Sequence, residues 1–354
     1  MTVPDDLKAS LRSLALRLGF SDCRVAEARP AAHREIFEQW IADGKYGDMA
    51  WMARNVERRT DPCVVLPGAK SVVVFALNYY QGEAGQSAIR NPQSAINLEG
   101  RIARYAWNED YHDLIEKKLR DINTFLESQG GTQRFYVDTG PVLERDFASD
   151  SGLGWSGKST MQIHRSLGTW FFLAEIITTL ELAPDTAAKD LCGKCMRCMD
   201  ACPTNAITAP HRMDARKCIS YLTIEHKGSI PMEYRKAIGD RIYGCDECLV
   251  VCPWNKFAQA SNEAAFQARE SVFSMKLRDM LKLTDEEFRA LFSKSPIKRI
   301  KRPAFLRNVC VALGNIGTRD DLPALETAAQ DENALIAEHA QWALEEIRLR
   351  IDAA

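Results

Sequence analysis

The sequence predicts an α+β core, then a cysteine-rich insert, then an all-helical C-terminal unit. Three observations support this fold class. Amphipathic helical stretches alternate with short apolar runs over about the first 180 residues. Eight of the eleven cysteines lie between positions 192 and 252. After that region the pattern is helical, with glycine turns between the helices. We therefore expect three domains, at residues 1–184, 185–257 and 258–354.

Helices of the core are predicted from apolar residues that recur every three or four positions. The expected helices are Asp5–Leu18, Ala31–Ala42 and Tyr111–Ser128. Glycines follow each of them within a few residues and are typical helix ends.

Strands of the core are predicted from short runs of β-branched and aromatic residues. Ser71–Leu77 (SVVVFAL) is continuously apolar, which indicates a strand buried on both faces. Further runs are expected at Arg134–Val137, Trp170–Leu173 and Ile176–Leu180.

Short helices separated by glycines are expected near the C-terminus. They are Phe305–Leu313, broken by Gly314 and Gly317, then Leu322–Ala329 and Ala334–Ile347. Such a series is similar to a HEAT-like α-hairpin repeat, and one unit must pack on the rest of the chain to bury its apolar face.

The cysteines of the insert form two runs, each closed by a proline. The first run, C-x2-C-x2-C-x3-C-P, is Cys192, Cys195, Cys198 and Cys202, and the second is Cys218, Cys245, Cys248 and Cys252. Soft thiolates in this pattern indicate two [4Fe-4S] clusters, as in bacterial two-cluster ferredoxins. Zinc ribbons prefer separate C-x2-C pairs, and disulfides are not expected without an export signal.

The ferredoxin pattern implies that the two runs share their ligands. Three cysteines of a run hold one cluster and the fourth ligates the other. The expected first quartet is Cys192, Cys195, Cys198 and Cys252, and the second is Cys202, Cys218, Cys245 and Cys248.

Bulk composition excludes several classes of protein. The formal net charge is −2, so nucleic-acid binding would require a local basic patch. No apolar run approaches the 18 residues of a membrane span, and the N-terminus does not resemble a signal peptide. We expect a cytoplasmic monomer without membrane contact.

The stretch Gly152–Ser159 reads GLGWSGKS and matches the phosphate-binding loop pattern. That loop requires a buried strand before it and a helix after it, so that backbone amides face the phosphate. Here the preceding residues are polar and the following ones alternate. We reject nucleotide binding and expect a glycine-rich turn leading into a strand, or a loop around another cofactor.

Several stretches together resemble the tRNA epoxyqueuosine reductases, whose core is similar to that of cobalamin-dependent reductive dehalogenases. They include GDMAWMARNVERRTDP, ARYAWNEDYH, YVDTGPVLERDFA, GLGWSGKST, CISYLTIEH, GCDECLVVCPWNK and SPIKRIKRPAFLRNVCVALGN. The resemblance covers nearly the whole chain. It implies a cobalamin-binding core, two [4Fe-4S] clusters and reduction of epoxyqueuosine to queuosine at the tRNA wobble position. This last step of queuosine synthesis converts an epoxide to an alkene.

The resemblance also implies roles for individual residues. Asp138, in the DTGPV motif, is expected to donate a proton, although an aspartate there could instead cap the next helix. We expect it at the end of a strand, in a dry pocket where a carboxyl group keeps its proton. The implied corrin contacts are Arg58, Tyr105, Lys158, Gln162, Asp246 and Glu247. Alternatively, Arg58 is part of a surface ion-pair cluster and Tyr105 is a half-buried core aromatic.

A basic segment near residue 300 is a candidate tRNA-binding surface. Its cations are Lys294, Lys298, Arg299, Lys301, Arg302 and Arg307, with no acidic residue between them. Six like charges beside a helical repeat favour phosphate binding near the anticodon, although a charged run is often only a solvated face.

Two other functions remain open from the sequence. One is a cobalamin and iron–sulfur reductase of a small molecule, such as an organohalide, which would not need the basic helical unit. The other is a non-catalytic electron-transfer protein with an ATP-binding loop. No dinucleotide fingerprint is present, so we expect an external electron donor such as a flavodoxin or a ferredoxin.

Overall fold

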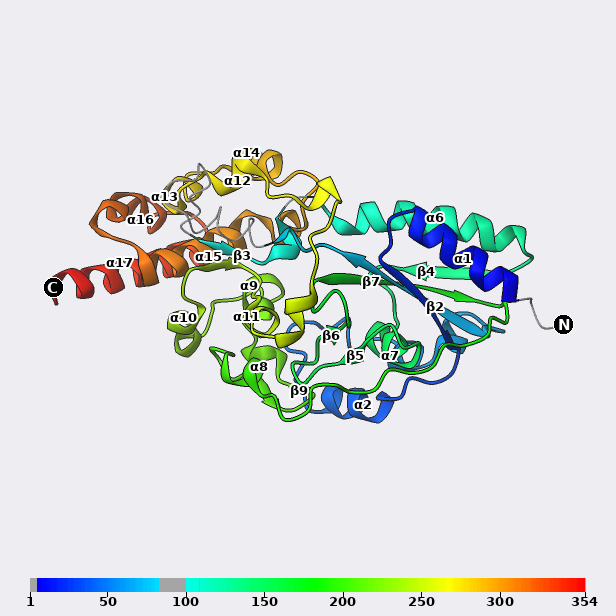
Figure 1. The fold of residues 1–354 in the computed structure, drawn as a ribbon. Coiled ribbons are helices and arrows are strands. Elements are labelled where there is room, and N and C mark those ends of the chain that lie inside the picture. The colour runs from blue at the N-terminus through cyan, green and yellow to red at the C-terminus, as the bar shows by residue number, and fades with distance from the viewer. Residues whose placement is uncertain (1–4, 83–99, 108, 354) are drawn as a thin grey trace.

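A four-stranded antiparallel sheet forms the centre of the N-terminal half (Figure 1). We describe it from a computed structural model covering residues 5–82, 100–107 and 109–353. The strands are β1 (Asp22–Glu27), β2 (Ser71–Asn78), β7 (Phe171–Thr178) and β4 (Gln133–Tyr136), in that spatial order. Every neighbouring pair is antiparallel. The prediction of mixed helix and sheet is confirmed.

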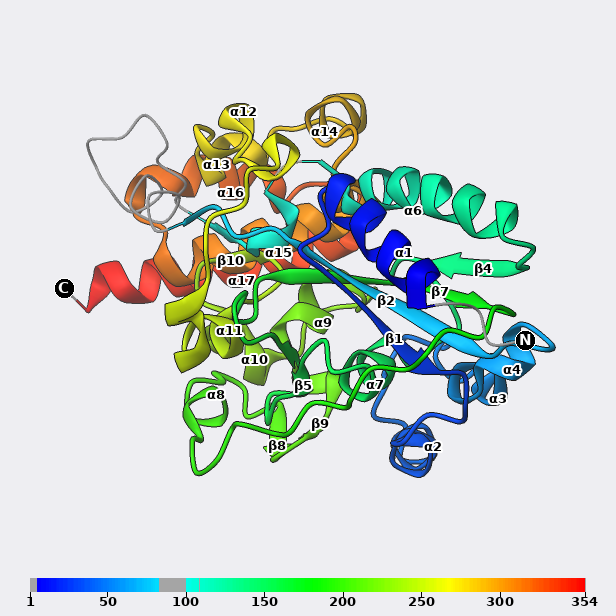
Figure 2. The same ribbon diagram turned by 45° about the vertical axis from the view of Figure 1, so that its right-hand side comes forward.

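Both faces of the sheet are covered by helices. Helices α1 (Asp5–Arg17) and α6 (Tyr111–Ser128) lie on one face, and α7 (Glu144–Asp150) lies on the other (Figure 2). Alternate residues of a strand point to opposite faces. Accordingly, β2 directs Val73, Phe75 and Leu77 toward α1 and α6, and Val72, Val74 and Ala76 toward α7. The continuous apolar run of β2 is therefore explained by burial on both sides, as predicted.

Some predicted boundaries in the core were wrong. The runs at 170–173 and 176–180 belong to the single strand β7, because pairing with β2 continues through the residues between them. Strand β1 was not predicted, since its sequence DCRVAE shows no clear apolar run. Helix α2 begins only at Arg34 and ends at Ala42.

The cysteine-rich region and the C-terminal helices share one hydrophobic core. Residues of α9 (Ile219–Ile224), α10 (Met232–Ile238) and β10 (Arg241–Tyr243) pack with those of α15 (Lys301–Ile316) and α17 (Ala334–Asp352). Strand β10 also pairs with β3 (Arg101–Ile102), which anchors this shared core to the N-terminal half. The predicted boundary at residue 258 thus runs through a continuous core.

Helix α15 carries a buried polar network at its centre. The guanidinium of Arg307 is fully buried and donates hydrogen bonds to the carbonyls of Leu222, His226 and Gly228. Burial lowers its pKa to about 10. These acceptors lie at the C-terminal end of α9 and just beyond it, where unpaired carbonyls favour a cation. Arg307 therefore holds α9 against α15, and its prediction as a surface phosphate contact was wrong.

Two of the C-terminal helices are longer than predicted. Helix α15 continues through Gly314 to Ile316, and the glycine there makes room for Trp342 of α17, whose ring would lie 2.3 Å from a Cβ atom at that position. Helix α16 (Leu322–Ala328) matches its prediction closely, and α17 extends past Ile347 to Asp352. Among the described residues, no helix is long and apolar enough to cross a membrane.

Shorter elements complete the described chain. They are α3 (Val56–Thr60), α4 (Pro62–Val65), η1 (Arg104–Ala106), β5 (Trp155–Ser156), β6 (Gln162–Ile163), α8 (Arg197–Asp200), β8 (Ile207–Ala209), β9 (Arg212–Met213), η2 (Ala215–Lys217), α11 (Glu247–Val250), η3 (Pro253–Phe257), η4 (Ala264–Phe266), α12 (Glu270–Phe273), α13 (Leu277–Met280), α14 (Asp285–Leu291), η5 (Pro296–Ile300) and η6 (Arg319–Asp321).

Candidate functional site

The first cysteine quartet brings together both ends of the insert. The pKa of the Cys252 thiol is raised to about 11, first by burial and then by the charge of neighbouring thiolates. Those neighbours are Cys192, Cys198 and Cys195. The short helices α8 and α11, which carry ligands of the two runs, pack against each other. Cys252 thus lies with the first run, as the crossed pattern predicts.

The second quartet is assembled in the same way. Burial raises the pKa of Cys248 well above its usual value, and three nearby thiolates raise it further. These are Cys218, Cys245 and Cys202. Cys202 therefore faces the cysteines of the second run and not those that precede it in sequence.

The surroundings of the first quartet fit an iron–sulfur cluster. Burial raises the pKa of Cys192, while the indole N–H of Trp155 lies close enough to oppose that rise. This N–H is buried and has no hydrogen-bond acceptor among the described protein atoms, so it is available to a cluster sulfur. In the described part of the chain, no three side chains of His, Cys, Asp or Glu are close enough together to hold a single metal ion. The ligands of a cubane cluster stand farther apart than those of a single ion, and soft thiolates suit such a cluster.

The loop that resembles a phosphate-binding loop has another structure and another neighbour. Trp155 and Ser156 pair with Ile163 and Gln162 as a two-stranded hairpin, so no helix opens after the glycines. The Lys158 ammonium donates hydrogen bonds to the carbonyls of Gly193, at 2.6 Å, and Cys195, at 3.1 Å. The prediction of a glycine-rich turn leading into a strand is confirmed, and its lysine holds the loop that carries Cys192 and Cys195.

Asp138 lies two residues beyond β4 in a strained backbone conformation, with φ of 59°. Its carboxylate accepts a hydrogen bond of 2.7 Å from the Tyr111 hydroxyl, and its backbone N–H donates to Glu144 at 2.8 Å. The N-cap of α7 is Leu143, so Asp138 does not cap that helix. Its side chain is 59% exposed, so the expected dry pocket was wrong for this state of the protein.

His112 is the imidazole neighbour of Asp138. Its Nε2 atom lies 3.8 Å from the Asp138 carboxylate, and its Nδ1 atom lies 2.7 Å from Asp110. Burial lowers the pKa of His112, but the hydrogen bond and charge of Asp110, and the charge of Asp138, outweigh it and raise the pKa overall. The ring stacks on Tyr111, with centroids 4.0 Å apart. A protonated imidazolium can therefore stand beside the Asp138 carboxylate.

Two carboxyl groups lie behind Asp138, of which Glu175 is fully buried and Glu144 is half-buried. Burial raises the pKa of Glu144 to about 7, and the charge of Asp138 adds to this rise. Glu175 of β7 is fully buried, and neither of its carboxyl oxygens has a full hydrogen bond among the described atoms. Burial and the neighbouring Glu144 raise its pKa well above the usual value. The pair is close enough for its charges to interact, so at least one member holds a proton near neutral pH.

The residues expected to contact a corrin lie on several elements, and most of them contact other protein groups. Tyr105 packs edge-on to Tyr111, with ring centroids 6.0 Å apart, and is half-buried. Gln162 is buried against Ser149, and Arg58 is exposed on α3.

The two acidic residues of that set lie in α11 and just before it. The Asp246 carboxylate accepts the backbone N–H of Arg104 at 2.7 Å, and burial raises its pKa to about 6. Glu247 pairs with Arg101 and Arg241, at 2.6 and 2.5 Å. Both therefore join the cysteine region to the segment around β3 and η1.

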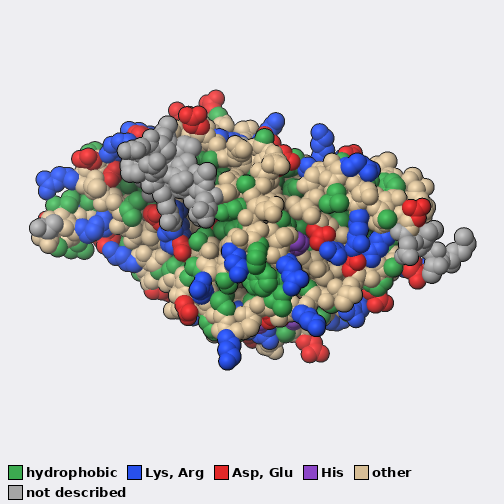
Figure 3. Space-filling view, in the orientation of Figure 1, with side chains coloured by type: hydrophobic (Ala, Val, Ile, Leu, Met, Phe, Trp, Pro, Cys, Tyr) green, Lys and Arg blue, Asp and Glu red, His purple; other side chains and the backbone are tan. Residues whose placement is uncertain are grey.

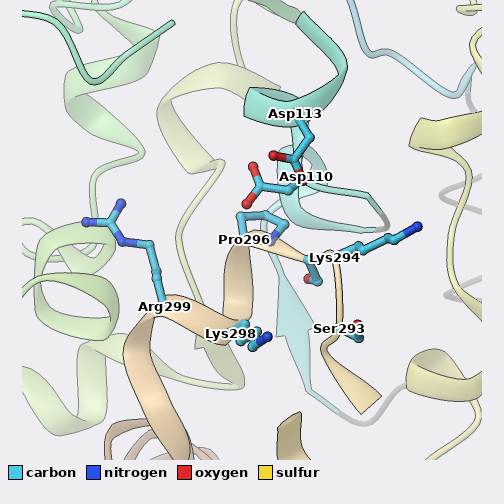
Figure 4. A pocket seen from close by; sticks show the side chains of 8 residues that line it. Asp110, Asp113, Ser293, Lys294, Pro296, Lys298 and Arg299 are labelled. Atoms are coloured by element: carbon cyan, nitrogen blue, oxygen red, sulfur yellow. The ribbon is translucent and has the colours of Figure 1, made fainter. Parts of the chain in front are cut away.

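The basic segment lies beside a hollow at the start of α6 (Figure 4). Asp110 and Asp113 line its upper side, while Lys294 and Arg299 extend from the lower side in opposite directions. Lys294, Lys298, Arg299 and Lys301 are exposed. Arg299 pairs with Glu225 at 2.6 Å.

Arg302 differs from these exposed cations. It is half-buried, pairs with Asp331 at 3.0 Å and donates to the Leu283 carbonyl. The exposed part of the predicted patch is therefore smaller than the sequence indicated.

Comparisons with known proteins identify the family. Residues 59–139 match a family described as "Epoxyqueuosine reductase QueG, DUF1730", and residues 191–255 match a "4Fe-4S double cluster binding domain". The epoxyqueuosine reductase of Xanthomonas campestris is 42% identical over 96% of this chain and 96% of its own. The chain belongs to the epoxyqueuosine reductase family. It is therefore an oxidoreductase, as the resemblance implied.

Solved structures of epoxyqueuosine reductases share the fold. One, crystallised with an epoxyqueuosine-modified tRNA-Tyr stem loop, has a TM-score of 0.88 and 30% identity, covering 97% of this chain and 90% of its own. The Bacillus subtilis enzyme, with its catalytic aspartate loop swung out of the active site, has a TM-score of 0.86 at the same identity and coverage.

Sequence reasoning missed several neighbours of the reductase site. They are Tyr111 and His112 beside Asp138, the pair Glu144 and Glu175, and Trp155 beside Cys192. Tyr111, His112 and Glu144 stood within the quoted motifs, so their position there was an available signal. Glu175 lay inside an apolar strand, where a lone carboxylate is unusual.

The crossed ligand sets can be tested with double variants. Cys198→Ser/Cys252→Ser removes two ligands of one cluster, and we expect the iron content to fall from about eight to about four per chain. Cys198→Ser/Cys202→Ser removes one ligand from each cluster and should leave almost no iron. Iron analysis after anaerobic reconstitution measures both, with Cys63→Ser, outside the quartets, as the control. If instead Cys198→Ser/Cys202→Ser kept about four irons and Cys198→Ser/Cys252→Ser kept almost none, each run would hold its own cluster.

The buried carboxyl group of Glu175 predicts a pH-dependent stability. The pKa of Glu175 is higher in the folded protein than in the unfolded chain, so its contribution is fully present below about pH 4.3 and is lost as the pH rises. Glu175→Gln cannot ionise and should gain stability over the parent between pH 5 and 8, by up to about 1.4 kcal/mol per pH unit. Thermal unfolding at both pH values measures this, with the exposed Glu181→Gln as control. Parallel pH curves for parent and Glu175→Gln would contradict the prediction.

Proposed function

We propose that this protein reduces epoxyqueuosine in tRNA to queuosine. The reaction consumes two electrons and two protons, converts the epoxide to an alkene and releases water. The observation that supports this proposal is the near-complete match to epoxyqueuosine reductases, which spans both cysteine quartets and Asp138.

Members of this family depend on cobalamin together with two [4Fe-4S] clusters. Bound cobalamin would supply a cobalt centre that collects electrons and acts on the epoxide carbon, which no side chain can do. Of the donors expected around the corrin, Arg58 is exposed and would suit its peripheral amide oxygens. Lys158 and Gln162 would have to give up hydrogen bonds to Gly193, Cys195 and Ser149 to do the same. The cysteine quartets would hold the clusters that deliver single electrons.

Asp138 is the proposed proton donor. Opening the epoxide leaves a negatively charged oxygen, which a positioned acid stabilises by protonation. Tyr111 fixes the carboxyl group, Glu144 fixes the backbone, and His112 stands within 3.8 Å as a source of positive charge. A bound tRNA would cover the exposed carboxyl group and exclude water from it. In one structure of the Bacillus subtilis enzyme the catalytic aspartate loop is swung out of the active site, which supports the proposal that the loop carrying Asp138 can move.

The exposed cations near residue 300 are the proposed tRNA contacts. A related reductase was crystallised with a tRNA stem loop, which supports a tRNA substrate here. Lys294, Lys298 and Arg299 line one hollow with Asp110, which contacts His112, and Lys301 follows them in the chain. We propose that the C-terminal helices form a HEAT-like support for this surface, which would take the anticodon region. A cytoplasmic monomer fed by a flavodoxin or ferredoxin completes the proposal.

The catalytic role of Asp138 can be isolated from electron supply. Asp138→Asn keeps the size of the side chain but cannot donate the proton, so turnover should fall about 100-fold or more. We would follow queuosine formation in epoxyqueuosine-containing tRNA with cobalamin-loaded enzyme and a strong chemical reductant. Iron content and tRNA affinity should stay unchanged, and Asp121→Asn, exposed on α6, is the control. Parent-like product formation by Asp138→Asn would exclude it as the acid.

The tRNA surface predicts a change in salt dependence. Lys294→Gln/Lys298→Gln/Lys301→Gln should weaken tRNA binding and reduce the log–log salt slope by about 0.7–0.9 for each phosphate that is no longer neutralised. Binding titrations over a series of salt concentrations measure the slope. Lys45→Gln/Lys70→Gln/Lys117→Gln removes the same charge elsewhere and should leave it unchanged. Equal slopes for the first triple variant and the parent would mean that these lysines face solvent in the complex.

A further inference from the structure

The surface next to the first quartet combines exposed apolar side chains with cations that form no ion pair. Figure 3 shows hydrophobic side chains gathered over the region of α8 and α11, with lysines and arginines around them. We call it the entry surface, and define it by Leu191, Val250, Phe257, Lys189, Lys194, Arg197, Arg212 and Lys256.

The apolar centre of the entry surface lies close to the cluster ligands in the chain. Leu191 is 39% exposed and precedes Cys192, while Val250 is 44% exposed and stands two residues before Cys252. Phe257 is 45% exposed, and its ring packs on Trp254 with centroids 5.5 Å apart. Large apolar side chains gathered at one exposed place mark contact sites for partners.

The cations of the entry surface have no ion-pair partner among the described residues. All five are exposed, whereas many other surface cations of the chain are paired. A neighbouring carboxylate, Asp190, already contacts His211 at 3.6 Å. The surface therefore presents a surplus of positive charge that the protein itself does not neutralise.

The first quartet lies nearer to this surface than the second. Cys218 and Cys245 pack against the C-terminal core, and Cys248 packs against the core of the sheet. The described hydrophobic cores include none of Cys192, Cys195, Cys198 or Cys252. A cluster on the first quartet would thus be the one within reach of an external donor.

We propose that the entry surface docks a small acidic one-electron carrier protein, and that electrons enter through the cluster of the first quartet. The inference rests on the proposed function, which needs an electron supply. In each encounter the carrier loses one electron and the cluster gains one, so two encounters supply the two electrons that the epoxide consumes. A small apolar centre within a charged ring is suited to brief redox encounters, which bury little area and depend on electrostatic steering.

Reduction by reduced flavodoxin, an acidic carrier, tests the surface directly. In Lys189→Glu/Lys194→Glu/Lys256→Glu we expect the second-order rate of cluster reduction at low salt to fall about tenfold or more. Added salt should slow the parent strongly and this variant little. Stopped-flow absorbance follows the clusters without tRNA, so the readout does not depend on the proposed substrate. The milder Lys189→Gln/Lys194→Gln/Lys256→Gln variant should show a smaller fall in the rate of cluster reduction. It keeps the test valid if charge reversal impairs cluster assembly.

Control measurements separate the possible outcomes. With a strong chemical reductant, both entry-surface variants should form product at the parent rate. If the parent itself forms no product, the proposed function is refuted but the docking result still stands. Lys294→Gln/Lys298→Gln/Lys301→Gln should be reduced by flavodoxin at the parent rate. Unchanged flavodoxin kinetics in both entry-surface variants would overturn the proposal. If the entry-surface variants lose tRNA affinity, the surface binds tRNA instead. If they lose a concentration-dependent dimer, the surface binds a second copy of the chain instead.

Discussion

The crossed pairing of the cysteine runs is the constraint on which the arrangement of this chain depends. Cys252 must return to the cysteines that begin the insert, and Cys202 must turn toward the run that ends it. The residues between them therefore form a closed loop that cannot be a separate lobe. Lys158 clamps one side of this loop from the sheet domain, and Arg307 clamps the other from α15. Burial of the second quartet against both main cores follows from the same geometry.

Two buried polar sites play opposite parts, one with its hydrogen bonds satisfied and supporting the fold, the other unsatisfied and beside Asp138. Arg307 and Asn308 use their donors on backbone carbonyls, so their burial fixes α9 and β10 without an orphaned charge. Glu175 has no such partners, and its neighbour Glu144 supports the strained backbone of Asp138. Strain and unpaired polar groups gather where the surrounding structure can hold them for a function. The carboxyl pair therefore marks the same end of the sheet as Asp138.

Three roles are distributed over different elements in the proposed mechanism. The acid lies beyond a strand of the N-terminal sheet, the tRNA cations lie from the end of α14 to the start of α15, and electron entry lies at α8 and α11. Tyr111 and His112 connect the first two, because α6 begins beside both Asp138 and the basic segment. Separate surfaces would allow a donor and a large tRNA to be bound at the same time. Such a layout suits a reaction whose electrons arrive one at a time.

The sequence by itself determined the features that are written in local patterns. The ligand cysteines follow from spacing, α6 follows from its apolar stripe, and the burial of β2 follows from its unbroken apolar run, because each pattern reports one element's own environment. Tertiary structure alone decided the rest. Arg307 belongs to a basic run in sequence but meets three carbonyls about 80 residues away, and so lies in the core. Asp138 gains Tyr111 from 27 residues upstream, and β1 exists because β2 offers it an edge to pair with. Long-range partners such as these leave no periodic trace in the chain, which is why the structure was needed to find them.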